Sequence, residues 1–252
     1  MTRSPASRTC AMSDTFYKIV RCLGYPAFGA SARPTVLHVD RIDRRGPLII
    51  APNHLSPYDV PCLMASTRQA LDFVSIVELF RNPVRAWFFG AMNALPLDRR
   101  RVDPATTRRI LDRLERGRKI VMFPEGRICN AHNSLLAGGS FNPSVARLAR
   151  LADAPIVPCV ILATGAYARP TAWLPLRRTR YGVIFGEPLL VGRRGDERSD
   201  CADAAERLRR AYRELYAQLH DASGLTVHDS PWRSRPSPTM PDCPIDAGAP
   251  HR

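Results

Sequence analysis

The chain has 252 residues, 45% of them hydrophobic, which is enough to bury one substantial core, and we expect a single domain. Its formal net charge of +14 comes almost wholly from arginine, which indicates an anionic partner: nucleic acid, a phosphorylated small molecule or an anionic membrane. The seven cysteines are scattered and never spaced as a CxxC pair, which argues against a disulfide framework and a zinc site and favours a reducing compartment.

Both ends of the chain are predicted to be disordered. Residues 1–14 are polar, and residues 221–252 collect proline, serine, aspartate and arginine with few bulky apolar groups. The folded domain is therefore expected over residues 15–220. The first residues hold no apolar run of the length that a signal peptide needs, so we do not expect secretion.

Residues 15–30 mix aromatic and aliphatic side chains with Lys18 and Arg21, a pattern typical of an amphipathic helix. Such a helix either lies in a membrane interface or packs on the domain core, and the sequence leaves both alternatives open. The longest apolar stretch, residues 154–168, contains Pro158 and Gly165 and is shorter than the roughly 20 residues that span a bilayer. No transmembrane helix is predicted.

Short apolar runs rich in β-formers predict strands, and several of them are apolar on both faces. These runs are residues 48–50, 73–76, 120–123, 156–161 and 182–185. Apolar residues at helical spacing predict helices over residues 104–116 and 202–220. Because helices alternate with strands, we expect an α/β layer fold.

His54 and Asp59 follow the first of these strands. Ser56 and Pro57 together form a good helix start, which places His54 just before a helix and Asp59 in its first turn. A carboxylate beside an imidazole gives a general base that can deprotonate a hydroxyl. By itself the spacing is very weak support, and taken alone it favours a capping or core histidine.

A second candidate cluster follows the strand that ends near Phe123. Glu125, Gly126 and Arg127 lie in the turn after it, where ligand sites gather in open α/β sheets. Gly126 permits close backbone approach and Arg127 suits a phosphate, although a tight turn with a surface ion pair has the same sequence. The charged run at residues 97–101 is typical of a solvated face, from which at most one arginine reaches a site. No GxSxG elbow is present, which favours direct attack by the acceptor over an acyl-enzyme.

Four blocks, NHLSPYD, LPLDR, FPEGR and APIVPCVI, occur in this order and resemble the glycerolipid acyltransferases of the lysophosphatidic-acid acyltransferase (glycerol-3-phosphate acyltransferase-like) family. The resemblance runs from about Phe16 to Leu190, with the motifs in residues 46–190. It implies a mixed, largely parallel sheet flanked by helices. It also implies transfer of a fatty-acyl group from an acyl thioester to the hydroxyl of a lysophospholipid, with no cofactor and no metal.

The resemblance assigns roles position by position. It makes His54 the catalytic base and Asp59 its orienting acid, the two ends of the HxxxxD motif. The residues that it assigns to substrate binding are Arg99, Glu125, Gly126, Arg127 and Pro158, the last of them in the region of the acyl donor or acyl chain. The family usually has Thr-Arg-Ser after FPEG, whereas here Arg127 follows Gly126 directly. Asn142 and Ser144 replace a lysine and a glycine common before the next helix.

These features predict an enzyme of phospholipid biosynthesis that acts on 1-acylglycerol-3-phosphate with acyl-CoA or acyl carrier protein as the donor. We expect it in the cytoplasm, bound peripherally to an anionic membrane at its inner face. Two alternatives stay open: another lipid acceptor, such as a lyso-ornithine lipid, and an inactive lipid-binding homologue. A nucleic-acid-binding protein is disfavoured, because no zinc-finger spacing, RNP-like strand or recognition helix is present.

Overall fold

The computed structural model describes residues 5–98, 103–139, 141–175, 178–193 and 195–229. The long helix α1 (Pro5–Ser31) leads into a domain that ends with helix α6 (Glu197–Ser223) and a short turn of 3₁₀ helix at Val227–Asp229. Helix α1 thus begins within the segment 1–14 that the sequence predicts to be disordered, and described elements continue to Asp229, nine residues beyond position 220. The remainder of the expected C-terminal tail, residues 230–252, lies outside the described residues.

Seven strands form one sheet in the order β1-β7-β6-β2-β5-β3-β4. Their bounds are β1 Ala32–Leu37, β2 Leu48–Pro52, β3 Asp72–Ile76, β4 Ala94–Leu97, β5 Lys119–Val121, β6 Ile156–Leu162 and β7 Thr179–Phe185. All neighbouring pairs are parallel except β6 and β7. The predicted single-domain fold with a mixed, largely parallel sheet is confirmed.

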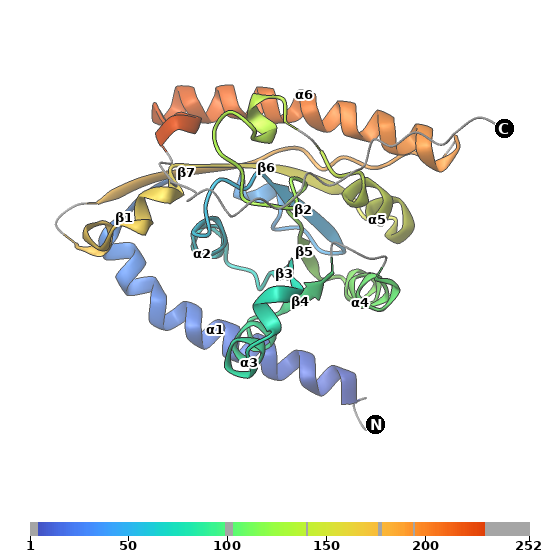
Figure 1. Ribbon diagram of the computed structural model, residues 1–252, viewed down its shortest axis with the longest axis horizontal. Helices are drawn as coiled ribbons and strands as arrows, with labels where there is room; N and C mark the ends of the chain where they lie inside the picture. The colour runs from blue at the N-terminus through green and yellow to red at the C-terminus, as the bar shows by residue number, and fades with distance from the viewer. Residues whose placement is uncertain (1–4, 99–102, 140, 176–177, 194, 230–252) are drawn as a thin grey trace.

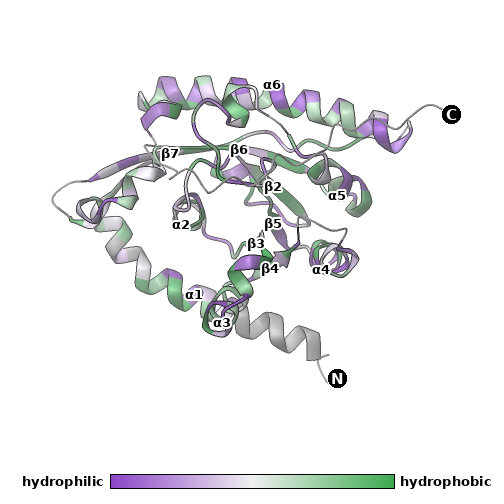
Figure 2. Ribbon diagram, viewed as in Figure 1, coloured by the Kyte–Doolittle hydropathy of each residue, from purple (hydrophilic) through white to green (hydrophobic). Residues whose placement is uncertain are grey.

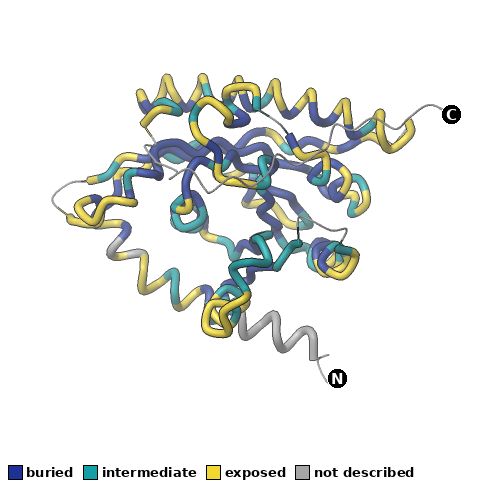
Figure 3. The backbone as a smooth tube through the Cα atoms, in the orientation of Figure 1, coloured by how far each residue is buried: buried dark blue, intermediate teal, exposed yellow. Residues whose placement is uncertain are grey.

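Helices cover both faces of this sheet (Figure 1). The remaining helices are α2 Asp59–Ala65, α3 Pro83–Ala91, α4 Pro104–Glu115 and α5 Ser144–Ala152. Alternate residues of β2 divide the core, because successive side chains of a strand point to opposite faces. Ile49 and Ala51 pack with α4, α5 and α6, whereas Leu48 and Ile50 pack with α1 and α2. The central strands β2, β5 and β6 are buried at every position, whereas the edge strands β1 and β4 are partly exposed (Figures 2 and 3).

The loops that follow β2 and β5 meet at the same edge of the sheet, since these two strands pair in parallel. Residues 53–58 lead from β2 into α2, and residues 122–134 follow β5. Helix α2 begins at Asp59 rather than at the predicted Ser56–Pro57 start. Ser56 instead forms a turn in which its hydroxyl oxygen accepts a hydrogen bond from the N–H of Tyr58 (3.1 Å). This tighter loop brings His54 back over the first turn of α2.

Candidate active site

Asp59 is the centre of a dense hydrogen-bond cluster beyond the end of β2. Its Oδ2 lies 2.9 Å from Nδ1 of His54 and accepts the backbone N–H groups of Leu55 (2.8 Å) and Ser56 (2.9 Å). Its Oδ1 accepts the hydroxyl of Thr164. The side chain is fully buried, and every one of these partners is a donor or can act as one. The carboxylate is therefore held rigidly with its oxygens turned to hydrogen-bond donors.

The His54 imidazole is oriented by this carboxylate. Since Oδ2 of Asp59 already accepts two backbone N–H groups, Nδ1 of His54 must donate the proton, which leaves Nε2 with a free lone pair. The ring stacks on Phe123 with centroids 4.0 Å apart and planes tilted by 24°. The His54 side chain is 16% exposed, so its ring lies at the surface of the site. An imidazole held in this way can act as a general base, and the predicted catalytic role of His54 stays a prediction.

Glu125 joins the two predicted motifs. One carboxylate oxygen accepts the backbone N–H of His54, and the other accepts that of Leu135 at 2.5 Å. Burial raises the pKa of Glu125 to about 7, although the N–H groups of Leu135 and His54 act to lower it. The structure thus shows Glu125 fixing the backbone of His54. Its predicted contact with substrate stays a prediction.

The turn after β5 has the geometry that its glycine requires. The N–H of Gly126 donates to the carbonyl of Phe123 (3.0 Å), and Gly126 adopts a φ of +64°, which favours glycine over residues with a side chain. Arg127 follows it as an exposed residue, and its positive charge acts on both Glu125 and Cys129. An exposed guanidinium close to Glu125 suits an anionic group of a substrate.

Two predicted site residues do not join this cluster in the structure. Arg99 lies outside the described residues. Pro158 is buried in β6, and its ring lies close to Gly186 together with Leu215 of α6, on the face of the sheet opposite α2. Any influence of Pro158 on an acyl chain would therefore act through the shape of the core, and its assigned role stays a prediction.

Three residues of the cluster have no role in the sequence prediction. Thr164 reaches Asp59 from the end of β6. Asn53 continues the pairing of β2 with β6, since its side-chain amide exchanges hydrogen bonds of 3.0 and 2.7 Å with the backbone of Ile161. Phe123 stacks on His54. Only Asn53 carried a signal, its position beside His54, because the other two depend on pairing between distant segments.

Cys129 lies behind the turn, with its N–H bonded to the carbonyl of His54 at 2.8 Å. Burial, reinforced by the charge of Glu125, raises the pKa of its thiol to about 11. A thiol in this state is a poor nucleophile, since the thiolate is the reactive form. A metal centre would need clustered ligands, and no group of three or more His, Cys, Asp or Glu side chains suited to a metal gathers among the described residues.

The family model described as Acyltransferase matches residues 33–162, just over half of the chain. The chain belongs to this family. The matched segment contains His54, Asp59 and the turn at Glu125, and the resemblance drawn from the four sequence blocks is confirmed.

Named relatives and one solved structure agree with this membership. Two chloroplastic 1-acyl-sn-glycerol-3-phosphate acyltransferases are each 28% identical to the chain: BAT2 of Brassica napus over 123 residues, and LPAT1 of Arabidopsis thaliana over 147 residues. These matches cover 47% and 57% of this chain but only 34% and 39% of the relatives, so the chain spans well under half the length of the curated relatives it matches. The crystal structure of the 1-acyl-sn-glycerophosphate (LPA) acyltransferase PlsC from Thermotoga maritima has the same fold, with a TM-score of 0.61, 21% identity and coverage of 86% of this chain and 85% of that one.

Proposed function

We propose that the protein transfers a fatty-acyl group from an acyl thioester to the free hydroxyl of a lysophospholipid, 1-acylglycerol-3-phosphate, in phospholipid biosynthesis. The observation that carries this proposal is the 2.9 Å contact between Nδ1 of His54 and Asp59, which leaves Nε2 available as a base. The activities for which the two plant relatives are named support the choice of acceptor.

In the proposed reaction, Nε2 of His54 takes the proton of the acceptor hydroxyl as its oxygen attacks the thioester carbonyl. Asp59 stabilises the imidazolium that forms. Collapse of the tetrahedral intermediate breaks the carbon–sulfur bond, and the imidazolium returns the proton to the departing thiolate, so the products are an ester and a free thiol. Because the thioester is already activated, the protein chiefly supplies a base, a phosphate contact at Arg127 and alignment of the two substrates.

The test measures ester formation and thiol release with a panel of lysolipids and both donor types. His54→Ala is expected to lower the turnover by roughly 100- to 10,000-fold, the usual contribution of a general base, while the melting temperature changes little. Exposed His132 provides a matched control, and His132→Ala should retain wild-type turnover. Retained turnover in His54→Ala would refute the assignment of the base. If only a lyso-ornithine lipid were acylated, that lipid would replace 1-acylglycerol-3-phosphate as the proposed acceptor. A wild-type protein inactive with every combination of donor and acceptor would identify a lipid-binding homologue.

We propose further that the protein works at the surface of an anionic membrane. Helices α1 and α3 lie side by side, since Phe16 makes an edge contact with Trp87 at a centroid distance of 5.4 Å. They present an exposed apolar surface, which we call the α1–α3 surface and which consists of Ile19 (51% exposed), Leu23 (75%), Val84 (73%), Trp87 (64%) and Phe88 (39%). Exposed aliphatic and aromatic side chains beside Lys18 and Arg85 are typical of interfacial binding. Within the described part of the chain, no helix has the length and apolar character needed to cross a bilayer.

A further inference from the structure

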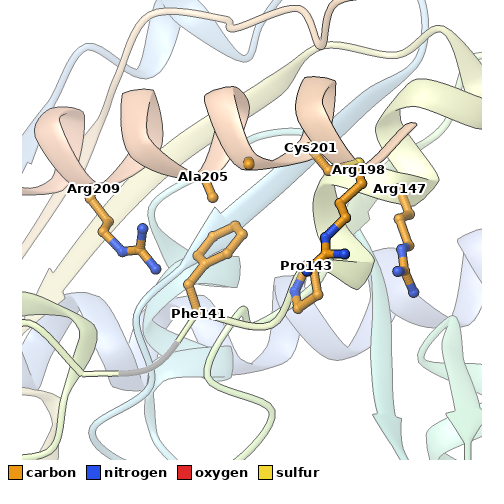
Figure 4. A pocket seen from close by; sticks show the side chains of 8 residues that line it. Phe141, Pro143, Arg147, Arg198, Cys201, Ala205 and Arg209 are labelled. Carbon is orange, nitrogen blue, oxygen red and sulfur yellow. The ribbon is translucent and has the colours of Figure 1, made fainter. Parts of the chain in front are cut away.

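An open groove of about 360 Å³ lies between α5 and α6 (Figure 4). Its volume is in the range of roughly 300–1,000 Å³ that is usual for small-molecule sites. Its floor is apolar, formed by the buried Phe141, Cys201 and Ala205, and its rim carries Arg147, Arg198 and Arg209. A groove with an apolar floor and three guanidinium groups fits a ligand that combines a flat ring system with phosphates.

The spacing along α6 places its two arginines over the groove. Positions 198, 202, 205 and 209 recur at helical spacing and so share one face of the helix. Two carboxylates lie near the arginines of this rim: Glu197 is 3.2 Å from Arg147, and Glu206 is 3.5 Å from Arg209. All four side chains are about half exposed, so the carboxylates neutralise the rim only weakly. Such solvent-exposed pairs contribute little, so a phosphate can displace them. Arg198 has no ion pair with any carboxylate that the structure describes.

The wall of the groove is tied directly to the active site. Asn142, between the groove residues Phe141 and Pro143, donates its backbone N–H to the carbonyl of Pro124 at 2.9 Å. Pro124 precedes Glu125, whose carboxylate accepts the N–H of His54. The groove therefore lies on the α5–α6 side of the turn that positions the base, separated from His54 by a single loop.

The chemical structures of the acceptor and of the acyl donor decide which of the two fits the α5–α6 groove. In 1-acylglycerol-3-phosphate the phosphate ester is on the carbon adjacent to the one that bears the reacting hydroxyl. The phosphate must therefore bind beside His54. The described lining of the groove includes neither His54, Glu125 nor Arg127. In acyl-CoA a long pantetheine arm separates the thioester from the diphosphate, the 3′-phosphate and the adenine, which matches a remote cationic groove.

We propose that the α5–α6 groove binds the phosphorylated nucleotide end of an acyl-CoA donor, with Arg198 and Arg209 on its phosphates and Phe141 beneath its base. This inference rests on the proposed function, because it assigns the donor of the same reaction. An acidic carrier protein would also meet the arginines, but a concave site with an aromatic side chain in its floor matches a nucleotide better than a convex protein surface. The α6 half of the groove lies beyond residue 162, where the family match ends.

The first experiment is a calorimetric titration of the full-length protein with coenzyme A and with adenosine 3′,5′-bisphosphate. Arg198→Ala and Arg209→Ala are each expected to raise the dissociation constant about tenfold, since each removes a charge-assisted contact. Arg210→Ala is the matched control: it removes the same charge from the neighbouring position of α6, which points away from the groove, and it should bind as the wild type does. Equal binding by the wild type and the groove variants would overturn the proposal.

The second experiment separates this inference from the proposed function by comparing two donors. With acyl-CoA, the groove variants should show a raised KM at nearly unchanged kcat. With an acyl-N-acetylcysteamine thioester, which lacks phosphates, they should equal the wild type. A wild type that binds neither nucleotide probe, with groove variants that lose transfer only from acyl carrier protein, would assign the groove to that protein instead and sink the proposal. Arginine-dependent nucleotide binding without transfer to any lysolipid would leave the groove standing and refute the proposed function.

Discussion

At the scale of single residues, the site depends on two carboxylates, those of Asp59 and Glu125, whose oxygens accept hydrogen bonds from neighbouring groups. Asp59 is surrounded by His54, two backbone N–H groups and Thr164, and Glu125 by two further backbone N–H groups. Buried carboxylates are costly unless such donors satisfy them, and the loss of one donor leaves the charge uncompensated. Several of these donors, His54 and the N–H groups of Leu55 and Ser56 among them, belong to the loop that carries the imidazole, so the same bonds that satisfy the carboxylates fix its position.

The raised pKa of Glu125 makes a prediction about stability and pH. With a folded pKa of about 7 against an ordinary value of 4.5, the folded state binds the proton more tightly than the unfolded state does. The contribution of this group is thus greatest below pH 4.5 and is lost as the pH rises to about 7, by about 3 kcal/mol at most. Glu125→Gln does not titrate, so the difference in unfolding free energy between wild type and variant should change across this window.

Urea unfolding of both proteins at several pH values between 4 and 8 measures this difference. A constant offset between the two curves would contradict a raised pKa at Glu125. The variant should also lose turnover, because its amide has one acceptor oxygen where the carboxylate has two, and one of the N–H groups of His54 and Leu135 then faces an NH₂ group.

At the scale of elements, helix α1 is fixed to the domain by a partly buried ion-pair network around the fully buried Asp72. Asp14 accepts hydrogen bonds from both terminal nitrogens of Arg118 (2.8 and 2.7 Å). Arg118 also forms an ion pair with the fully buried Asp72. Arg113 reaches Asp72 at 2.9 Å, and the amide of Asn93 donates to Asp14 at 2.9 Å. This network, together with the buried Tyr17, holds α1 against the domain from Asp14 onward.

Removing the charge of Asp14 should loosen α1. Although burial opposes it, Arg118 holds the pKa of Asp14 below its usual value, so the carboxylate is ionised and paired at neutral pH. Asp14→Asn should lower the unfolding free energy by about 1–3 kcal/mol and speed amide exchange within α1. The control Asp112→Asn removes a half-exposed pair with Arg116 at 3.9 Å and should cost less than about 0.5 kcal/mol. An equal effect of both changes would show that the network does not stabilise α1.

At the scale of the whole molecule, two surfaces of different chemistry lie on opposite sides of the sheet. The α1–α3 surface is apolar and exposed, whereas α5 and α6 carry the arginine groove. Figure 1 shows α1 and α3 on one side of the sheet and α6 on the other. The active-site loops extend from the sheet edge between these two helical layers. Lipid at the α1–α3 surface and a polar donor at the α5–α6 groove would then approach the same base from different sides.

Membrane binding tests this division. The double variant Leu23→Gln with Trp87→Gln should lower binding to vesicles that contain anionic phospholipid by about tenfold or more, because each exposed apolar side chain contributes about 1–2 kcal/mol when it is buried. The control variant Leu151→Gln with Leu190→Gln removes two comparably exposed leucines, of 60% and 59%, outside this surface and should bind as the wild type does. Co-sedimentation with vesicles measures both, and equal losses would contradict a defined membrane-binding surface.

The sequence by itself determined the local features: five of the seven strands that the structure describes, the helices α4 and α6, and the proximity of His54 to Asp59, which one short loop ensures. The two strands that it did not predict, β1 and β4, are the edges of the sheet and contain Pro34 and Pro96, as edge strands do. Only the tertiary structure decided the contacts between distant segments: Thr164 with Asp59, Glu125 with the backbone of His54, and Asp14 with Arg118. The physical reason is that periodicity reports which face of an element is buried, whereas strand order and register decide which buried faces and loops meet.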